Sequence, residues 1–120
     1  MTKEMGLWID HRQAVIMSAL ENDEDIKRVT SGDATESHDP NADDGRDRHF
    51  AEQLHHYYEE VITHLRDASA ILILGPGEAK GELQKHLETH GIDASLITVK
   101  TADKMTDNQL VAEIRQHFEK

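Results

Sequence analysis

The segment from Gly75 to Lys80 contains the residue types that can hold an anion. Gly75, Pro76 and Gly77 form a turn after an apolar run, and a helix is expected to begin directly after them. Backbone N–H groups at a helix N-terminus attract anions, and Lys80 adds a positive charge one turn into the helix. This pattern favours contact with a phosphate or an RNA backbone, but it also suits a plain structural turn, because Glu78 competes with any phosphate. The spacing fits neither a Walker loop nor the dinucleotide-binding glycine fingerprint.

Some of the nine histidines have a spacing that invites a metal hypothesis. Residues three or four apart on a helix are neighbours, so a row of His and Glu at this spacing could chelate a divalent ion. An apolar stripe lies roughly opposite on the same expected helix, so we interpret the row as a solvated face and predict no metal site. The row comprises His49, Glu52, His56, Glu60 and His64.

Asp10 ends the first expected strand, where one class of metal-dependent nucleases places a metal-binding carboxylate. Two-metal cleavage needs further acids that converge on this position. Glu52 could supply one, but the neighbouring expected strand ends in Gly75, Pro76 and Gly77 and offers none. We therefore interpret Asp10 as a turn-forming residue and predict no catalytic residue. A metal-dependent nuclease is kept as a remote alternative.

Four aromatic residues, Trp8, Phe50, Tyr57 and Tyr58, could stack on nucleic-acid bases. Phe50 and Tyr57 recur at helical spacing with apolar neighbours, which favours core packing. We expect only the rim of Tyr58 to remain accessible.

Acidic residues are concentrated in one part of the 120-residue chain. Residues 21–47 hold ten acidic and three basic residues, which accounts for −7 of the formal charge of −11. Within this block, residues 31–45 lack any large apolar side chain and cannot offset their ordering entropy by burial. We predict a flexible acidic loop at about 31–46.

The composition also excludes several kinds of chemistry. The chain has no cysteine, so disulfides, thiolate zinc sites and thiol nucleophiles are excluded, and we predict no cofactor. No stretch approaches the roughly 18 apolar residues of a membrane helix. A signal peptide would need an apolar run near the N-terminus, but this part of the chain contains Asp10, His11 and Arg12. We expect a soluble, cytoplasmic protein of one domain, residues 1–120, without membrane contact.

Changes in hydrophobic period predict the elements that must position these residues. Three strands joined by tight turns come first, as an antiparallel meander, and helices then alternate with strands, as in parallel crossovers. This predicts an α/β fold of the order βββαβαβα, with a mixed five-stranded sheet and helices packed on its faces, which is the order of the ribonuclease-H-like layout. The predicted strands are 5–10, 13–20, 25–30, 70–74 and 94–99, and the predicted helices are 47–67, 78–90 and a terminal helix that Thr106 caps.

Three motifs in this order resemble a known family. An Asp10-His11-Arg12 turn leads into an apolar strand, a long helix carries the pair Tyr57-Tyr58, and a later strand ends in Leu74-Gly75-Pro76-Gly77-Glu78-Ala79-Lys80. Read in register over residues 6–118, they resemble the middle domain of the archaeal and eukaryotic class-1 peptide release factors and of pelota. The resemblance implies a domain of the translational machinery with a ribosome- or RNA-associated role.

The chain departs from this family at the catalytic tip. Release factors carry a Gly-Gly-Gln tripeptide with basic neighbours in the loop before the long helix, whereas this chain has acids there and no such tripeptide. We therefore expect no peptide release, and expect a non-catalytic adaptor for a ribosome or RNA-bearing complex. Its contacts would come from Gly75, Pro76, Gly77, Lys80, Asp10, His11 and Arg12.

Two further kinds of partner stay open. The acidic loop at 31–45 could fold on a basic protein partner, which would make the chain a protein-interaction module. An exposed edge strand could also pair with a second copy to form a homodimer.

Overall fold

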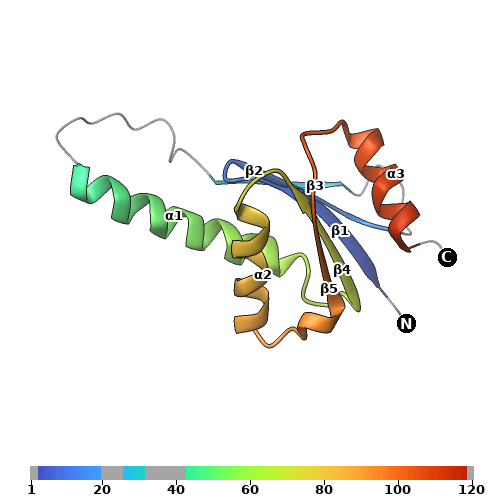
Figure 1. Ribbon diagram of the computed structural model, residues 1–120. Helices are drawn as coiled ribbons and strands as arrows, with labels where there is room; N and C mark the ends of the chain where they lie inside the picture. The colour runs from blue at the N-terminus through green and yellow to red at the C-terminus, as the bar shows by residue number, and fades with distance from the viewer. Residues whose placement is uncertain (1–2, 20–25, 32–42, 119–120) are drawn as a thin grey trace.

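The computed structural model describes residues 3–19, 26–31 and 43–118, with residues 43–50 described as backbone only. Five strands form one open sheet in the order β3-β2-β1-β4-β5, with three α-helices around it (Figure 1). The elements are β1 (Glu4–Ile9), β2 (Gln13–Ser18), β3 (Lys27–Thr30), α1 (Asp43–Thr63), β4 (Ala70–Gly75), α2 (Ala79–Thr89), the 3-10 helix η3 (Ala94–Leu96), β5 (Ile97–Thr101) and α3 (Asp107–Phe118). The predicted order βββαβαβα and the mixed α/β sheet are confirmed.

The sheet combines an antiparallel half with a parallel half. Strand β2 pairs antiparallel with both β1 and β3, as predicted for the meander. Strand β4 pairs parallel with β1 on one side and with β5 on the other. Strands β1 and β4 therefore lie at the centre, and β3 and β5 are the edges.

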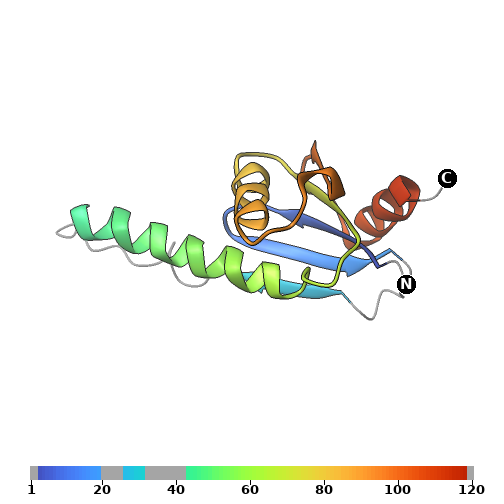
Figure 2. The same cartoon turned by 90° about the horizontal axis from the view of Figure 1, so that it is seen from below.

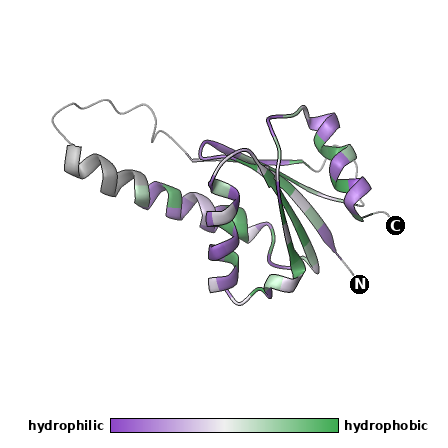
Figure 3. Cartoon of the chain, in the orientation of Figure 1, coloured by the Kyte–Doolittle hydropathy of each residue, from purple (hydrophilic) through white to green (hydrophobic). Residues whose placement is uncertain are grey.

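Alternate residues of each central strand point to opposite faces of the sheet, and both faces are covered. Leu7, Ile9, Ile71 and Ile73 are buried in the core under α1 and α2, whereas Trp8, Leu72 and Leu74 are buried under α3. Figure 3 shows hydrophobic residues concentrated on the strands, while α2 and α3 alternate hydrophobic and hydrophilic residues, as amphipathic helices do.

Helices α1 and α2 share one face of the sheet. Figure 2 shows α1 running along the side of β2 and β3, with α2 beside its C-terminal half, and α1 extends past the sheet at its N-terminal end. The predicted apolar stripe is confirmed where it is described: Tyr57, Tyr58, Val61 and Ile62 of α1 are buried, and so is Leu65 in the turn that follows. The side chain of Phe50 lies outside the described residues.

Several predicted boundaries were wrong, three of them by three residues or more: α1 begins and ends four residues earlier than predicted, and β5 begins at Ile97 instead of residue 94. Helix α1 begins at Asp43, not residue 47, so the last residues of the predicted acidic loop are helical, and negative charge in a first turn favours helix formation. The rest of that loop, residues 32–42, lies outside the described residues. Residues 94–96 form η3 instead of the start of a strand, because the Asp93 side chain accepts the Ser95 N–H at 2.9 Å.

The predicted capping residues of two helices are confirmed. Gly91 ends α2 with a φ of 90°, and Thr106 caps α3 by accepting the Gln109 N–H at 3.2 Å. The indole Nε1 of Trp8 donates to the Asp103 carbonyl at 3.1 Å and so ties β1 to the segment before α3. No helix in the described part of the chain has the length and apolarity needed to cross a membrane.

Candidate functional site

The Asp10–Arg12 hairpin and the Gly75–Lys80 turn meet at one edge of the sheet, here called the carboxyl edge. Strands β1 and β4 run parallel with Trp8 opposite Leu74, so both end at this edge. A Cβ atom added to Gly75 would lie 2.2 Å from the carbonyl oxygen of Ile9. Glycine is therefore required for this close approach, and the segments that carry all seven predicted contact residues lie next to each other.

The hairpin is held by the side chain of Asp10. Its Oδ1 accepts the backbone N–H groups of Arg12 at 2.7 Å and Gln13 at 2.8 Å, and its own N–H donates to the Gln13 carbonyl at 3.0 Å. This confirms Asp10 as a turn-forming residue. The side chain of Arg12 is left exposed to solvent.

A pair of tyrosines connects the hairpin to α1 and α2. The hydroxyl of Tyr57 donates to the Asp10 carbonyl at 2.9 Å, and that of Tyr58 donates to Oε1 of Glu82 at 2.5 Å. The same Oε1 lies 3.2 Å from Nε2 of His11. The carboxyl edge is therefore fixed to both helices of this face through side-chain hydrogen bonds.

The expectation of an accessible Tyr58 rim was wrong, because only 2% of Tyr58 is exposed. Helix α2 covers the ring, which lies 5.1 Å from that of His86. Burial raises the pKa of Tyr58 far above its ordinary value, with a further contribution from the hydrogen bond to Glu82. Burial also raises the pKa of Tyr57, with a smaller contribution from the charge of Asp10. Both hydroxyls therefore remain protonated donors at neutral pH.

The start of α2 has mixed charge. The ammonium of Lys80 donates to the Gly77 carbonyl, so this lysine closes the turn itself. A shallow pocket of about 600 Å³ lies here, and its lining includes two basic and three acidic side chains. A phosphate at this position would have to compete with Glu78 and Glu82. The charged lining residues are Glu78, Lys80, Glu82, Lys85 and Glu88.

A second, more basic pocket lies at the other end of the central strands and was missed from the sequence. This basic pocket has a volume of about 270 Å³, and its charged lining is Lys3, Lys27, Arg66 and Asp67, together with His64. These residues are far apart in the sequence, and the sheet brings them together: β2 pairs with β1 and with β3, which carries Lys27, and β4 pairs with β1 after the turn that holds His64, Arg66 and Asp67. No local spacing could have revealed the pocket.

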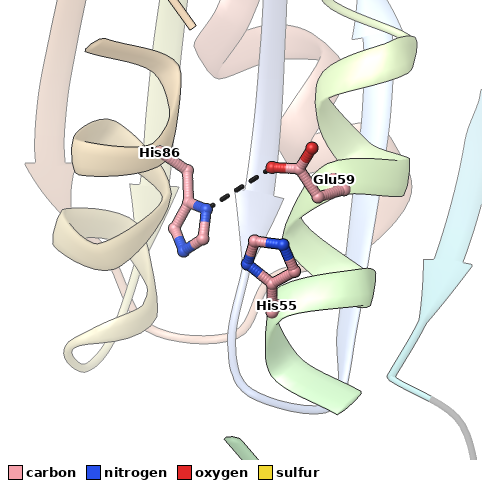
Figure 4. A group of neighbouring side chains, drawn as sticks. All are labelled: His55, Glu59 and His86. Carbon is pink, nitrogen blue, oxygen red and sulfur yellow. Dashed lines mark ion pairs between the residues drawn. The ribbon is translucent and has the colours of Figure 1, made fainter. Parts of the chain in front are cut away.

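The predicted row of His and Glu on α1 faces solvent where it is described. Glu52, His56 and Glu60 are exposed, His64 is half-buried in the turn after α1, and the side chain of His49 lies outside the described residues. A different group gathers between α1 and α2: His55, Glu59 and His86 (Figure 4). One nitrogen or oxygen from each of these three lies within 4.8 Å of the others. The sequence signal for this group was the spacing of four between His55 and Glu59 and between His86 and His90.

Solved protein structures share the fold of this chain. No protein-family model and no curated protein matches the chain. The crystal structure of Pelota from Thermoplasma acidophilum is similar over 96% of this chain and 32% of that chain, with 20% sequence identity and a TM-score of 0.59. The chain has the fold of a part of Pelota.

A second Pelota structure has a similar fold. The structure from Archaeoglobus fulgidus is similar over 97% of this chain and 31% of that chain, with 16% identity and a TM-score of 0.62. The chain thus spans about one third of the length of the Pelota chains that it matches. The resemblance predicted from the sequence is confirmed at the level of the fold, and the architecture is compatible with the ribonuclease-H-like layout.

Proposed function

We propose that this chain is a non-catalytic, translation-related adaptor of the cytoplasm that contacts the ribosome or another RNA-bearing complex. The observation that carries the proposal is the likeness to Pelota over 96% of the chain. The absence of a Gly-Gly-Gln tripeptide from the sequence separates it from peptide release. Nuclease activity is disfavoured because Asp10 is bound within its own turn and the adjacent strand β4 ends in Gly75.

The carboxyl edge is the surface that we assign to this contact. Arg12 is exposed there, and Lys80 is the second residue of α2, where its ammonium also donates to the Gly77 carbonyl. The hydrogen bond of Tyr57 joins the hairpin to α1, and that of Tyr58 joins α1 to Glu82 of α2. Ligands of open α/β sheets commonly bind at the carboxyl ends of parallel strands, and β1 and β4 end at this edge.

Two charge-matched double variants test the assignment. Arg12→Ala with Lys80→Ala removes two positive charges at the carboxyl edge, and Lys3→Ala with Lys27→Ala removes two at the basic pocket. Both change the formal charge from −11 to −13, so a difference between them reports position and not total charge. The measurement is cosedimentation with ribosomes across a salt series, since each lost phosphate contact lowers both the affinity and its salt dependence.

We expect the wild type to cosediment at low salt and the carboxyl-edge variant to lose most of this binding. The basic-pocket variant should behave as the wild type does. Loss of binding only in the basic-pocket variant would mean that the contact lies at the other end of the sheet. A wild type that does not cosediment even at low salt would contradict the proposed function.

A second candidate is an acidic module that binds a basic protein. The charge of −7 between residues 21 and 47 favours it, because such a segment attracts basic surfaces. Deletion of residues 31–45 separates the two candidates. It should abolish capture of a protein partner in a nuclease-treated pull-down under this second idea, and leave ribosome binding intact under the first.

A further inference from the structure

Two pairs of potential metal ligands face each other across the contact of α1 with α2. His55 and Glu59 are four residues apart on α1, and His86 and His90 are four apart on α2. Residues at this spacing project from the same side of a helix. Each helix therefore offers a pair of potential ligands at the same interface.

The distances within this group are close to those of a coordination shell. Nδ1 of His86 lies 3.6 Å from Oε2 of Glu59, and the rings of His55 and His86 are 5.4 Å apart between centroids (Figure 4). Zinc bonds to nitrogen and oxygen measure about 2.0–2.2 Å, so tetrahedral ligand atoms lie roughly 3.3–3.6 Å from one another. The pair from His86 to Glu59 already has this separation. One nitrogen of His55 lies within 4.8 Å of the other two ligand atoms, and its ring is exposed, so a change of rotamer can move it toward them.

We propose that His55, Glu59 and His86 form a site for one divalent transition-metal ion of the Zn²⁺ type. Two imidazoles with one carboxylate suit Zn²⁺ and its neighbours, whereas Mg²⁺ and Ca²⁺ prefer oxygen ligands. Three protein ligands leave a fourth position for water or for another donor. This site is independent of the proposed ribosome contact and lies on a different part of α2.

His90 is the positioning residue of the site. Its Nε2 lies 2.7 Å from Oε2 of Glu59 and holds the carboxylate against α2. Glutamate is ionised at neutral pH, which is the form that binds a cation.

The ligands are accessible to an ion from solvent. Between 28% and 33% of the side chains of Glu59, His86 and His90 is exposed. A cavity of about 370 Å³ opens beside His55 and His86, and its lining also includes Glu82 and Lys85, whose opposite charges offset each other. A bound ion would link α1 to α2 and so limit the movement of the part of α1 that extends past the sheet.

The chain offers a matched control on the same helix. His56 and Glu60 repeat the His-to-Glu spacing of His55 and Glu59 but are exposed and lie outside the cluster. We therefore compare His55→Gln, Glu59→Gln and His86→Gln with His56→Gln and Glu60→Gln. The probe is Zn²⁺, titrated by calorimetry into the full chain, with Mg²⁺ as a negative control. Co²⁺ serves as a second probe, because tetrahedral coordination gives it intense visible absorption.

We expect one tight Zn²⁺ per chain, a tetrahedral Co²⁺ spectrum and a higher melting temperature with Zn²⁺. Each ligand variant should weaken tight binding by more than about tenfold, since even outer partners of a metal contribute that much. The two control variants should keep it. If His86→Gln perturbs the metal-free fold, the test rests on His55→Gln, because His55 is exposed and its replacement should leave the fold intact. The proposal is overturned if no tight site exists, or if the ligand and control variants lose binding equally.

Discussion

The tyrosine hydroxyls provide a residue-scale test of the carboxyl edge. In the folded chain the pKa values of Tyr57 and Tyr58 are raised above the ordinary value of 10.0, mainly by burial. Above about pH 10 the unfolded chain releases these protons and the folded chain does not, so stability falls as pH rises. We expect the denaturation midpoint to be constant from about pH 7 to 9 and to decrease above about pH 10.

Tyrosinate absorbance can be assigned to these two side chains, because Tyr57 and Tyr58 are the two tyrosines of the sequence. Near-ultraviolet absorbance of tyrosinate should rise together with the loss of helix signal in circular dichroism. The Tyr58→Phe variant removes the donor to Glu82 and should cost about 1–2 kcal/mol at neutral pH. Tyrosines that ionise near pH 10 in a chain that stays folded would contradict the buried, hydrogen-bonded arrangement.

Residue roles were predictable from the sequence where the partner is a near neighbour in the chain. Asp10 binds N–H groups two and three residues ahead, and Thr106 binds the one three residues ahead. The burial of Tyr58 was not predictable in this way, because α2 covers it and Glu82 follows 24 residues later. The cluster of His55, Glu59 and His86 likewise depends on how α1 packs against α2.

At the scale of elements, two glycines should respond in opposite directions to replacement by alanine. Gly75→Ala would place a Cβ 2.2 Å from the Ile9 carbonyl oxygen, between two central strands. We expect it to destabilise the fold by about 2 kcal/mol or more. Gly81 lies inside α2 with nothing within 4 Å of an added Cβ, so Gly81→Ala should stabilise by about 0.5–1 kcal/mol.

Chemical denaturation of both variants measures these effects. The second variant also serves as the control for the first, since both add one methyl group close to the same turn. A Gly75→Ala variant as stable as the wild type would mean that β1 and β4 are farther apart at their ends than described.

Element order was predictable because the hydrophobic period changes clearly along the chain, and the starts of α1 and β5 were misplaced where that signal is weak. Residues 43–46 are polar, so they have no apolar stripe, and their helical state depends on continuation from the stronger segment after them. Residues 94–96 continue into an apolar strand, and two hydrogen bonds to Asp93, from Ser95 N–H to its side chain and from Leu96 N–H to its carbonyl, separate them from β5.

For the whole molecule, the sheet order predicts where local stability is highest. Strands β1 and β4 are paired on both sides, and their side chains are covered on both faces. Strands β3 and β5 are edges, and most of β3 is exposed. We expect amide hydrogens of β1 and β4 to exchange slowest and those of β3 to exchange much faster. Hydrogen exchange read by mass spectrometry checks this, and slower exchange in β3 than in β1 would contradict the sheet order.

The hydrogen bond of Trp8 makes the face covered by α3 optically observable. This is the single tryptophan of the sequence, 4% exposed, and its indole is joined to the Asp103 carbonyl. Its fluorescence therefore reports on one side of the sheet, while tyrosinate absorbance reports on the other. Detachment of α3 alone would shift the emission to longer wavelength before any tyrosine ionises, so the two layers can be followed separately in one unlabelled sample.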